Sequence, residues 1–278
     1  MLNQYSGTTR LGLIEVHMGM FEGKTAIVMG ASTPGGMGVA TARRLRREGA
    51  RVVVSGIDEQ PLQDLAQEID GLAFEADITS KQANVDLVNF TLENYGQIDL
   101  AVNHVGLATR GPIAEETEEH LQLMTEVNYF GTYWFIRAVA DVMEEGGAIV
   151  TTSSLVAYDV STGMSAYACA KAAAERFVEA AAVEYRHKRL RINSIIPSIN
   201  NTAMLRKGIE QRGNDFDEFV GLYKELTPLG RISTPEDIAG MVCLMLHPEF
   251  FDTGQHIHCS GGNSLLGQPR LLVTQDLK

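Results

Sequence analysis

The sequence predicts a doubly wound α/β fold, in which a central and mainly parallel sheet lies between two layers of helices. Short apolar runs rich in β-branched residues alternate with longer helical patterns, the order that parallel strands and crossover helices require. Several of these runs lead into polar or glycine-bearing residues, and the carboxyl ends of parallel strands share one edge of a sheet. With 278 residues and 45% hydrophobic composition the chain can fill one large core, so we expect a single domain.

Composition excludes several classes of function. The formal net charge of −12 argues against a nucleic-acid partner, which normally requires a basic surface. Three cysteines, far apart in sequence and without metal-ligand spacing, indicate neither a disulfide framework nor a zinc site, so we expect no metal. No apolar run is long enough to cross a bilayer, and residues 1–20 lack the features of a signal peptide. These observations predict a cytoplasmic protein that does not act at a membrane.

The first convincing elements are a strand over residues 25–29, a glycine loop over 30–38 and a helix over 39–48. Gly30, Gly36 and Gly38 allow the backbone to turn sharply and to approach a pyrophosphate closely. The helix N-terminus that follows offers unpaired N–H groups and a partial positive charge. Strand, loop and helix in this order predict a dinucleotide-binding unit.

The second strand, over residues 51–56, bears on the choice of dinucleotide. An acidic residue after this strand accepts hydrogen bonds from the adenosine ribose, whereas an arginine favours a 2′-phosphate. Gly56 stands at the expected acceptor position, Ile57 carries no positive charge, and Asp58 lies a little beyond. Since a 2′-phosphate near Asp58 would meet no obvious cation, we expect NAD(H) to be favoured over NADP(H).

Two further strands end in polar residues. The strand over residues 73–78 carries Asp77, which either holds the adenine amino group or caps the helix that starts near residue 79. The strand over 98–102 leads into Asn103, His104, Val105 and Gly106. These residues extend the predicted ligand crevice.

The catalytic chemistry is expected between residues 146 and 186, where an apolar run leads to Ser154 and a helical pattern begins with Tyr167 and Lys171. Residues four apart share a helix face, so the ammonium of Lys171 is expected to lower the pKa of the Tyr167 phenol. Such a tyrosine exchanges a proton near neutral pH, and the Ser154 hydroxyl can hold a carbonyl oxygen. The alternative is structural: a half-buried aromatic, a helix cap and a solvated charge.

From about residue 21 to residue 266 the chain resembles the short-chain dehydrogenase/reductase family, whose fold is Rossmann-type. Gly30, Gly36 and Gly38 match the family's TGxxxGxG loop, although this loop is two residues longer. Residues 103–106 stand where the family has NNAG, and 197–204 correspond to its PGxxxTxM, with Ser198 in place of glycine. Ser154 precedes Tyr167 by 13 positions, as in the family.

The resemblance implies a catalytic set of Asn128, Ser154, Tyr167 and Lys171. It implies that Tyr167 exchanges the substrate proton, that Lys171 binds ribose hydroxyls, and that Asn128 positions a water. The resemblance and the glycine loop together predict these cofactor-binding residues: Gly30, Ser32, Gly36, Met37, Gly38, Asp58, Asp77, Ile78, Asn103, Gly106, Tyr167, Lys171, Pro197, Ile199 and Thr202.

A substrate lid is expected over residues 198–226, because its apolar residues are spaced as in amphipathic helices. The predicted substrate contacts are Ser154, Val156, Tyr158, Met164, Tyr167 and Met204, mostly apolar, and they favour a hydrophobic ketone or secondary alcohol. The alternative is that the apolar side chains only pack the lid onto the body. Residues 1–20 are expected to form an N-terminal arm, 21–266 the catalytic domain, and 267–278 a tail.

The sequence therefore predicts an NAD(P)-dependent oxidoreductase that transfers hydride between the nicotinamide and a small-molecule carbonyl or alcohol. Two alternatives stay open: a non-redox lyase or dehydratase on the same fold, and a non-catalytic dinucleotide sensor. His104 is interpreted as a structural loop residue and Cys169 as an apolar filler. The resemblance also implies a homo-oligomer, a tetramer or dimer, that pairs the helices over about 121–143 and 167–185.

Overall fold

The computed structural model describes residues 19–159, 161–211 and 213–267. Within these residues seven strands form one sheet, all pairing in parallel, in the order β3-β2-β1-β4-β5-β6-β7. The strands are β1 (Thr25–Met29), β2 (Arg51–Gly56), β3 (Leu72–Glu75), β4 (Leu100–Asn103), β5 (Ala148–Thr152), β6 (Arg191–Pro197) and β7 (His256–Cys259). The predicted doubly wound α/β fold is confirmed.

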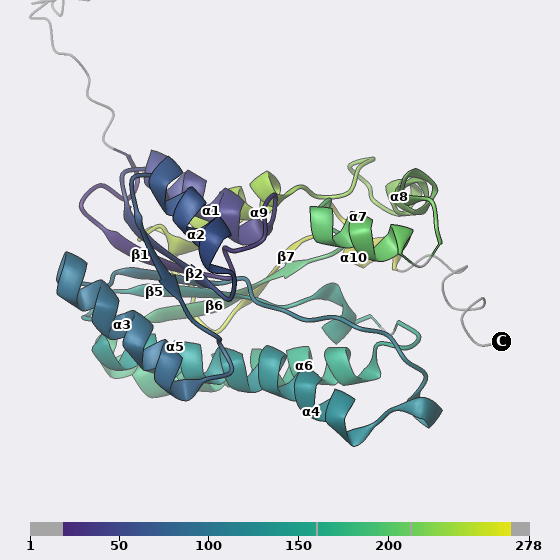
Figure 1. Ribbon diagram of the computed structural model, residues 1–278, viewed down its shortest axis with the longest axis horizontal. Helices are drawn as coiled ribbons and strands as arrows, with labels where there is room; N and C mark the ends of the chain where they lie inside the picture. The colour runs from purple at the N-terminus through teal and green to yellow at the C-terminus, as the bar shows by residue number, and fades with distance from the viewer. Residues whose placement is uncertain (1–18, 160, 212, 268–278) are drawn as a thin grey trace, which may run out of the picture.

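Helices cover both faces of this sheet (Figure 1). One layer contains α1 (Met37–Arg47), α2 (Glu59–Glu68) and α9 (Pro235–Leu246). The opposite layer contains α3 (Lys81–Tyr95), α5 (Gly131–Val142) and α6 (Ser165–Glu184), with α4 (Glu118–Thr125) leading into α5. None of the helices within the described residues is both long and apolar enough to span a bilayer.

Alternate residues of the central strands bury their side chains on opposite faces, which explains why these strands are continuously apolar. In β1, Val28 packs in the core beneath α1, α2 and α9, whereas Ile27 and Met29 pack beneath α3, α5 and α6. Burial of apolar surface on both faces supplies most of the favourable free energy of the fold.

The strand order reverses direction between β1 and β4. From β1 the chain proceeds outward through β2 and β3, then returns to place β4 on the other side of β1. The loops that leave the carboxyl ends of β1 and β4 therefore diverge and leave a crevice there, where ligands bind in open α/β sheets.

Two short helices, α7 (Ala203–Glu210) and α8 (Phe216–Glu225), follow β6 and lie outside the two helical layers (Figure 1). Their buried side chains form a small core of their own: Ile209, Phe216, Val220, Tyr223 and Ile232. The predicted lid is therefore helical, and much of its apolar spacing is explained by packing within the lid itself.

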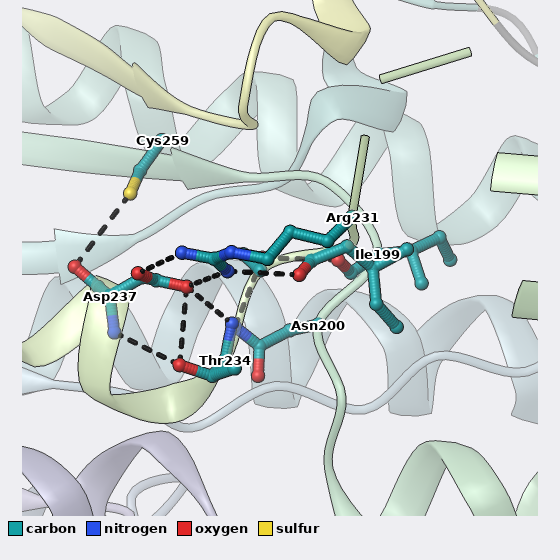
Figure 2. Close-up of polar contacts among 8 residues, drawn as sticks. Ile199, Asn200, Arg231, Thr234, Asp237 and Cys259 are labelled. Carbon is teal, nitrogen blue, oxygen red and sulfur yellow. Dashed lines mark hydrogen bonds and ion pairs between the residues drawn. The ribbon is translucent and has the colours of Figure 1, made fainter. Parts of the chain in front are cut away.

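A polar cluster anchors the start of this segment to α9, as Figure 2 shows. Arg231 donates to both carboxylate oxygens of Asp237, at 2.5 and 2.8 Å, and Asp237 forms a capping box with Thr234. The hydrogen bond from Arg231 holds the pKa of Asp237 well below its usual range. The hydroxyl of Ser233 donates to the Ile199 carbonyl oxygen at 3.0 Å, which joins the loop after β6 to this cluster.

Candidate active site

The predicted serine and tyrosine meet at the carboxyl edge of the sheet. Ser154 follows β5 and is the N-cap of the short 3₁₀ helix η3 (Leu155–Ala157). Tyr167 lies in the first turn of α6, and Ser154 hydrogen-bonds to its phenol. A substrate oxygen placed against both hydroxyls would have one donor for binding and one group for proton exchange.

The protonation of Tyr167 differs from the sequence-based expectation. Burial raises the pKa of its phenol above the ordinary value, and the hydrogen bond from Ser154 lowers it only in part. The Nζ of Lys171 lies 5.9 Å from the centre of the Tyr167 ring and donates elsewhere. The predicted lowering of this pKa by Lys171 is therefore not observed in the protein alone, because burial raises the pKa and only the hydrogen bond from Ser154 opposes that rise.

Lys171 is buried, with 2% of its surface exposed. Its Nζ donates to the carbonyl oxygen of Thr152 at 2.8 Å and to that of Val105 at 3.4 Å, which ties α6 to the ends of β5 and β4. Burial lowers the pKa of Lys171 to about 8, and the carboxylate of Glu175 opposes this shift. The ammonium is therefore held by carbonyl dipoles beside the crevice.

Asn128 lies in a π-helical turn, η2 (Glu126–Phe130), between α4 and α5. Its amide donates to the carbonyl oxygens of Leu107 and Met124, at 2.9 and 3.0 Å, and accepts from the Leu107 N–H at 3.2 Å. A Cβ added to Gly106 would lie 3.3 Å from Nζ of Lys171 and 3.5 Å from Oδ1 of Asn128. The structure thus brings Asn128 and Lys171 together around the loop after β4.

His104 joins three elements. Its ring nitrogens lie 2.8 Å from the hydroxyl of Thr41 in α1 and 2.8 Å from that of Thr152 at the end of β5. Burial, with the charge of Lys171, lowers the pKa of His104 to about 3, so the imidazole is neutral at physiological pH. The structural interpretation of this residue agrees with these contacts.

The glycine loop has the close geometry that a dinucleotide requires. A Cβ on Gly38 would lie 2.2 Å from the carbonyl oxygen of Gly30, and one on Gly30, whose φ is 86°, would lie 2.8 Å from the N–H of Val105. Gly36 is the N-cap of α1, which begins at Met37. Its first turn carries no acidic side chain, so the helix N-terminus suits a pyrophosphate.

The predicted adenosine end of the crevice lies beside Gly56 and Ser32. A Cβ on Gly56 would lie 2.8 Å from the Ser32 hydroxyl, so this buried serine occupies the space next to the end of β2. Asp58 is exposed at the N-cap of α2 and makes no side-chain capping bond. Asp77 accepts from the N–H and hydroxyl of Thr79, whereas Ser80 caps α3.

The remaining predicted cofactor-binding residues lie at the carboxyl ends of β4 and β6 or on the loops that follow β3, β4 and β6. Asn103 ends β4 and accepts from the N–H of Val105 at 2.9 Å, and Ile78 is buried. Pro197 ends β6, and Thr202 caps α7 by accepting from the Leu205 N–H. Between them Asn200 is buried, and its Oδ1 makes no hydrogen bond within the described residues. Such an acceptor suits a loop that meets a carboxamide.

Most of the predicted substrate residues lie in the turn after Ser154 or at the start of α6. Val156 lies in η3, and Met164 is buried at the N-cap of α6. The hydroxyl of Tyr158 hydrogen-bonds to Glu175, and its ring lies 5.4 Å from that of His258. Met204 belongs to α7, but its side chain lies outside the described residues.

Sequence reasoning missed Glu175, a buried acidic residue one helical turn beyond Lys171. The signal was present, since positions 167, 171 and 175 repeat every four residues along α6 and therefore follow one side of the helix. The sequence pattern does not show that this side of the helix is buried.

Comparison with known proteins agrees with this geometry. A family model described as Enoyl-(Acyl carrier protein) reductase matches residues 30–264. The 7alpha-hydroxysteroid dehydrogenase of Escherichia coli is 31% identical over 249 residues, which cover 87% of this chain and 94% of that protein. The Diacetyl reductase [(S)-acetoin forming] of Staphylococcus epidermidis is 29% identical over 257 residues, which cover 86% of this chain and 98% of that protein.

Solved structures show the same likeness. A variant of a short-chain dehydrogenase/reductase from Serratia marcescens superposes with a TM-score of 0.80 at 27% identity, covering 88% of this chain and 99% of that one. The chain belongs to the short-chain dehydrogenase/reductase family. The relatives named above are a reductase and a dehydrogenase. This chain is an NAD(P)-dependent oxidoreductase that acts on ketone and alcohol groups.

Proposed function

We propose that this enzyme interconverts a hydrophobic ketone and its secondary alcohol with NAD(H), and that Tyr167 exchanges the substrate proton. The observation that carries the proposal is the hydrogen bond between Ser154 and Tyr167 beside the buried ammonium of Lys171. When bound, the nicotinamide cofactor supplies or accepts the hydride.

In reduction, the Ser154 hydroxyl donates to the carbonyl oxygen and the Tyr167 hydroxyl gives its proton to the same oxygen as negative charge develops there. In oxidation, the phenolate of Tyr167 takes the proton of the alcohol. Burial raises the pKa of the phenol, so Tyr167 is protonated at neutral pH and can donate its proton in the reduction. The Lys171 ammonium favours the phenolate that remains after the transfer.

The choice of NAD(H) rests on charge. Residues 30–38 and 56–60, which border the predicted adenosine end of the crevice, contain no lysine or arginine. A 2′-phosphate there would lose its hydration without gaining a cation. The carboxylate of Asp58 would instead repel it.

The choice of a hydrophobic substrate rests on the side chains around Ser154. Val156 and Met164 flank the serine and the start of α6, and α7 and α8 follow the carboxyl end of β6 at the same edge of the sheet. We propose that residues 198–226 act as the lid of this pocket. We further propose that copies of the chain associate through α4, α5 and α6.

The proposal is tested by titrating the purified protein with NADH and NADPH, followed by turnover with hydrophobic ketones and alcohols. We expect NADH to bind more tightly and to be oxidised. Tighter binding of NADPH would overturn the cofactor assignment. Product formation without a change in NADH absorbance would indicate a lyase, and tight cofactor binding without turnover of any substrate would indicate a sensor.

Tyr167→Phe tests the proton donor directly. Loss of the hydroxyl should lower kcat by about 10² to 10⁴-fold, the usual contribution of a positioned acid or base. The affinity for NADH, measured by fluorescence titration, should stay within about twofold because the ring is retained. Unchanged turnover in this variant would exclude Tyr167 as the proton donor.

A further inference from the structure

Glu175 is a buried carboxylate that the reaction described above does not use. It lies in α6 with 7% of its surface exposed. A buried carboxylate is costly unless hydrogen bonds and charges compensate its lost hydration. Glu175 has both, because the hydroxyls of Ser153 and Tyr158 hydrogen-bond to it and its charge acts on Lys171.

The two hydroxyls come from opposite ends of one short turn. Ser153 immediately precedes Ser154, and Tyr158 immediately follows η3. The same turn is tied to the sheet by the N–H of Ser153, which donates to the Ile195 carbonyl oxygen at 2.9 Å. Glu175 therefore holds both ends of the segment that presents Ser154.

The carboxylate also belongs to the helix that carries the tyrosine and the lysine. Glu175 lies one turn after Lys171 and two turns after Tyr167 in α6. Because helices are stiff over this length, fixing the turn to Glu175 fixes the position of Ser154 relative to Tyr167. No backbone hydrogen bond of α6 itself could set this distance, since the two residues lie on different elements.

We propose that Glu175 is a positioning residue for the reaction: it clamps the 153–158 turn onto α6, so that the hydroxyls of Ser154 and Tyr167 converge on one substrate oxygen. This inference rests on the proposed function of those two residues. It assigns Glu175 no contact with substrate or cofactor.

The charge of Glu175 has a second effect, on Lys171. Burial lowers the pKa of Lys171 to about 8, and Glu175 acts in the opposite direction. Of the other groups around this ammonium, His104 at the end of β4 is neutral and Tyr167 is protonated at pH 7. Tyr158 is kept protonated by burial and by Glu175, and Glu179, one turn further on, pairs with His256 at 3.1 Å. Glu175 is thus the carboxylate that supports the positive charge of Lys171.

The clamp is tested with Glu175→Ala, Ser153→Ala and the double variant. Misplacement of a reacting group by about 1 Å costs up to about 10²-fold, so we expect Glu175→Ala to lower kcat by about 10 to 100-fold with the KM for NADH nearly unchanged. Ser153→Ala should cost about 3 to 10-fold. Since both changes remove the same contact, the double variant should be no slower than Glu175→Ala alone.

Glu175→Gln tests the charge, because glutamine keeps the size and one acceptor oxygen. The pH at which NADH affinity declines through loss of the Lys171 proton should fall by about one unit relative to the wild type. The matched control is Glu179→Gln, the same substitution one turn further along α6, which should alter neither kcat nor the pH profile.

One combined result would overturn the inference. If Glu175→Gln and Glu179→Gln share the wild-type pH profile, and Ser153→Ala and Tyr158→Phe keep wild-type kcat, Glu175 has no positioning role. Ser153→Ala and Tyr158→Phe, which each remove one hydroxyl, test the positioning role even if Glu175→Ala fails to fold. Failure of the proposed function is distinguishable, because then the wild type itself would show no turnover.

Discussion

At the scale of single residues, the site is governed by the competition between desolvation and polar contacts. Burial raises the pKa of Tyr167 and lowers that of Lys171, so each group is shifted toward its neutral form. The compensating contacts are few: Ser154 for the phenol, and the carbonyls of Thr152 and Val105 with the charge of Glu175 for the ammonium. Proton chemistry near neutral pH therefore depends on a small number of replaceable side chains.

Lys171 should make cofactor binding depend on pH. Its pKa is lowered to about 8, so the ammonium is present below that pH and lost as the pH rises through it. Since hydrogen bonds from charged donors are stronger than those from neutral ones, affinity for NADH should fall by about fivefold between pH 7 and 10. Fluorescence titrations across this range would show the decline.

Lys171→Ala provides the comparison for this measurement. The variant should bind NADH more weakly at pH 7 and show little further change up to pH 10, because the titrating group is gone. A wild type whose affinity is flat over the same range would contradict a role for the ammonium in cofactor binding.

At the scale of elements, the site is assembled by side chains that link one element to the next. His104 joins α1 to the end of β5, Lys171 joins α6 to the ends of β4 and β5, and Arg231 joins the segment before α9 to its first turn. These contacts hold the loops that border the crevice. Their loss should loosen the crevice before it unfolds the sheet.

His104 should make the fold sensitive to acid. Its pKa is lowered from 6.5 to about 3 in the folded protein, so between these values the unfolded chain binds a proton that the folded chain does not. Stability should therefore fall as the pH decreases from 6.5 toward 3. In His104→Asn this contribution to the slope should disappear, as measured by urea unfolding at a series of pH values.

The same variant should be less stable at pH 7 by about 1 to 3 kcal/mol, because the hydroxyls of Thr41 and Thr152 lose a partner. If the free energy of unfolding depends on pH with the same slope in the wild type and in His104→Asn, another group controls the acid sensitivity.

The lid should open independently of the sheet. Ile209 is buried in the small core that α7 and α8 share, apart from the two cores on the sheet. Ile209→Ala should raise hydrogen exchange across residues 203–225 and raise the KM for substrate, with the Tm of the whole protein changed little. Val242→Ala, in the core beneath α1 and α9, is the control and should lower the Tm itself. A fall in Tm without faster lid exchange would argue against a separate lid.

At the scale of the whole molecule, one sheet edge gathers the loops that follow the strands and carry many of the predicted functional residues, because all strands of the described sheet are parallel and their carboxyl ends coincide. The faces of the sheet are covered by helices, and some of these helices present apolar side chains outward. Leu121 and Leu123 in α4, and Val183 in α6, are 46%, 44% and 62% exposed. These side chains lie within the helices proposed to associate.

We expect the purified protein to have a mass that is a multiple of 30.3 kDa, measured by light scattering after size exclusion. Val183→Arg should reduce the number of chains in the assembly, because a charge within an apolar interface is costly. Leu229→Arg changes an apolar residue outside these helices that is 73% exposed, and it should leave the mass unchanged. A wild type of 30.3 kDa would contradict the proposed association.

The sequence by itself determined the fold class of this protein and singled out its candidate catalytic residues. Alternation of buried strands with helices fixes a doubly wound sheet, and the glycine loop and the spacing of Ser154, Tyr167 and Lys171 are local patterns that can be read directly. Only the tertiary structure decided the protonation of Tyr167, the contacts of His104 and the role proposed for Glu175. Each of these depends on burial and on partners from distant segments, which neither local spacing nor composition encodes.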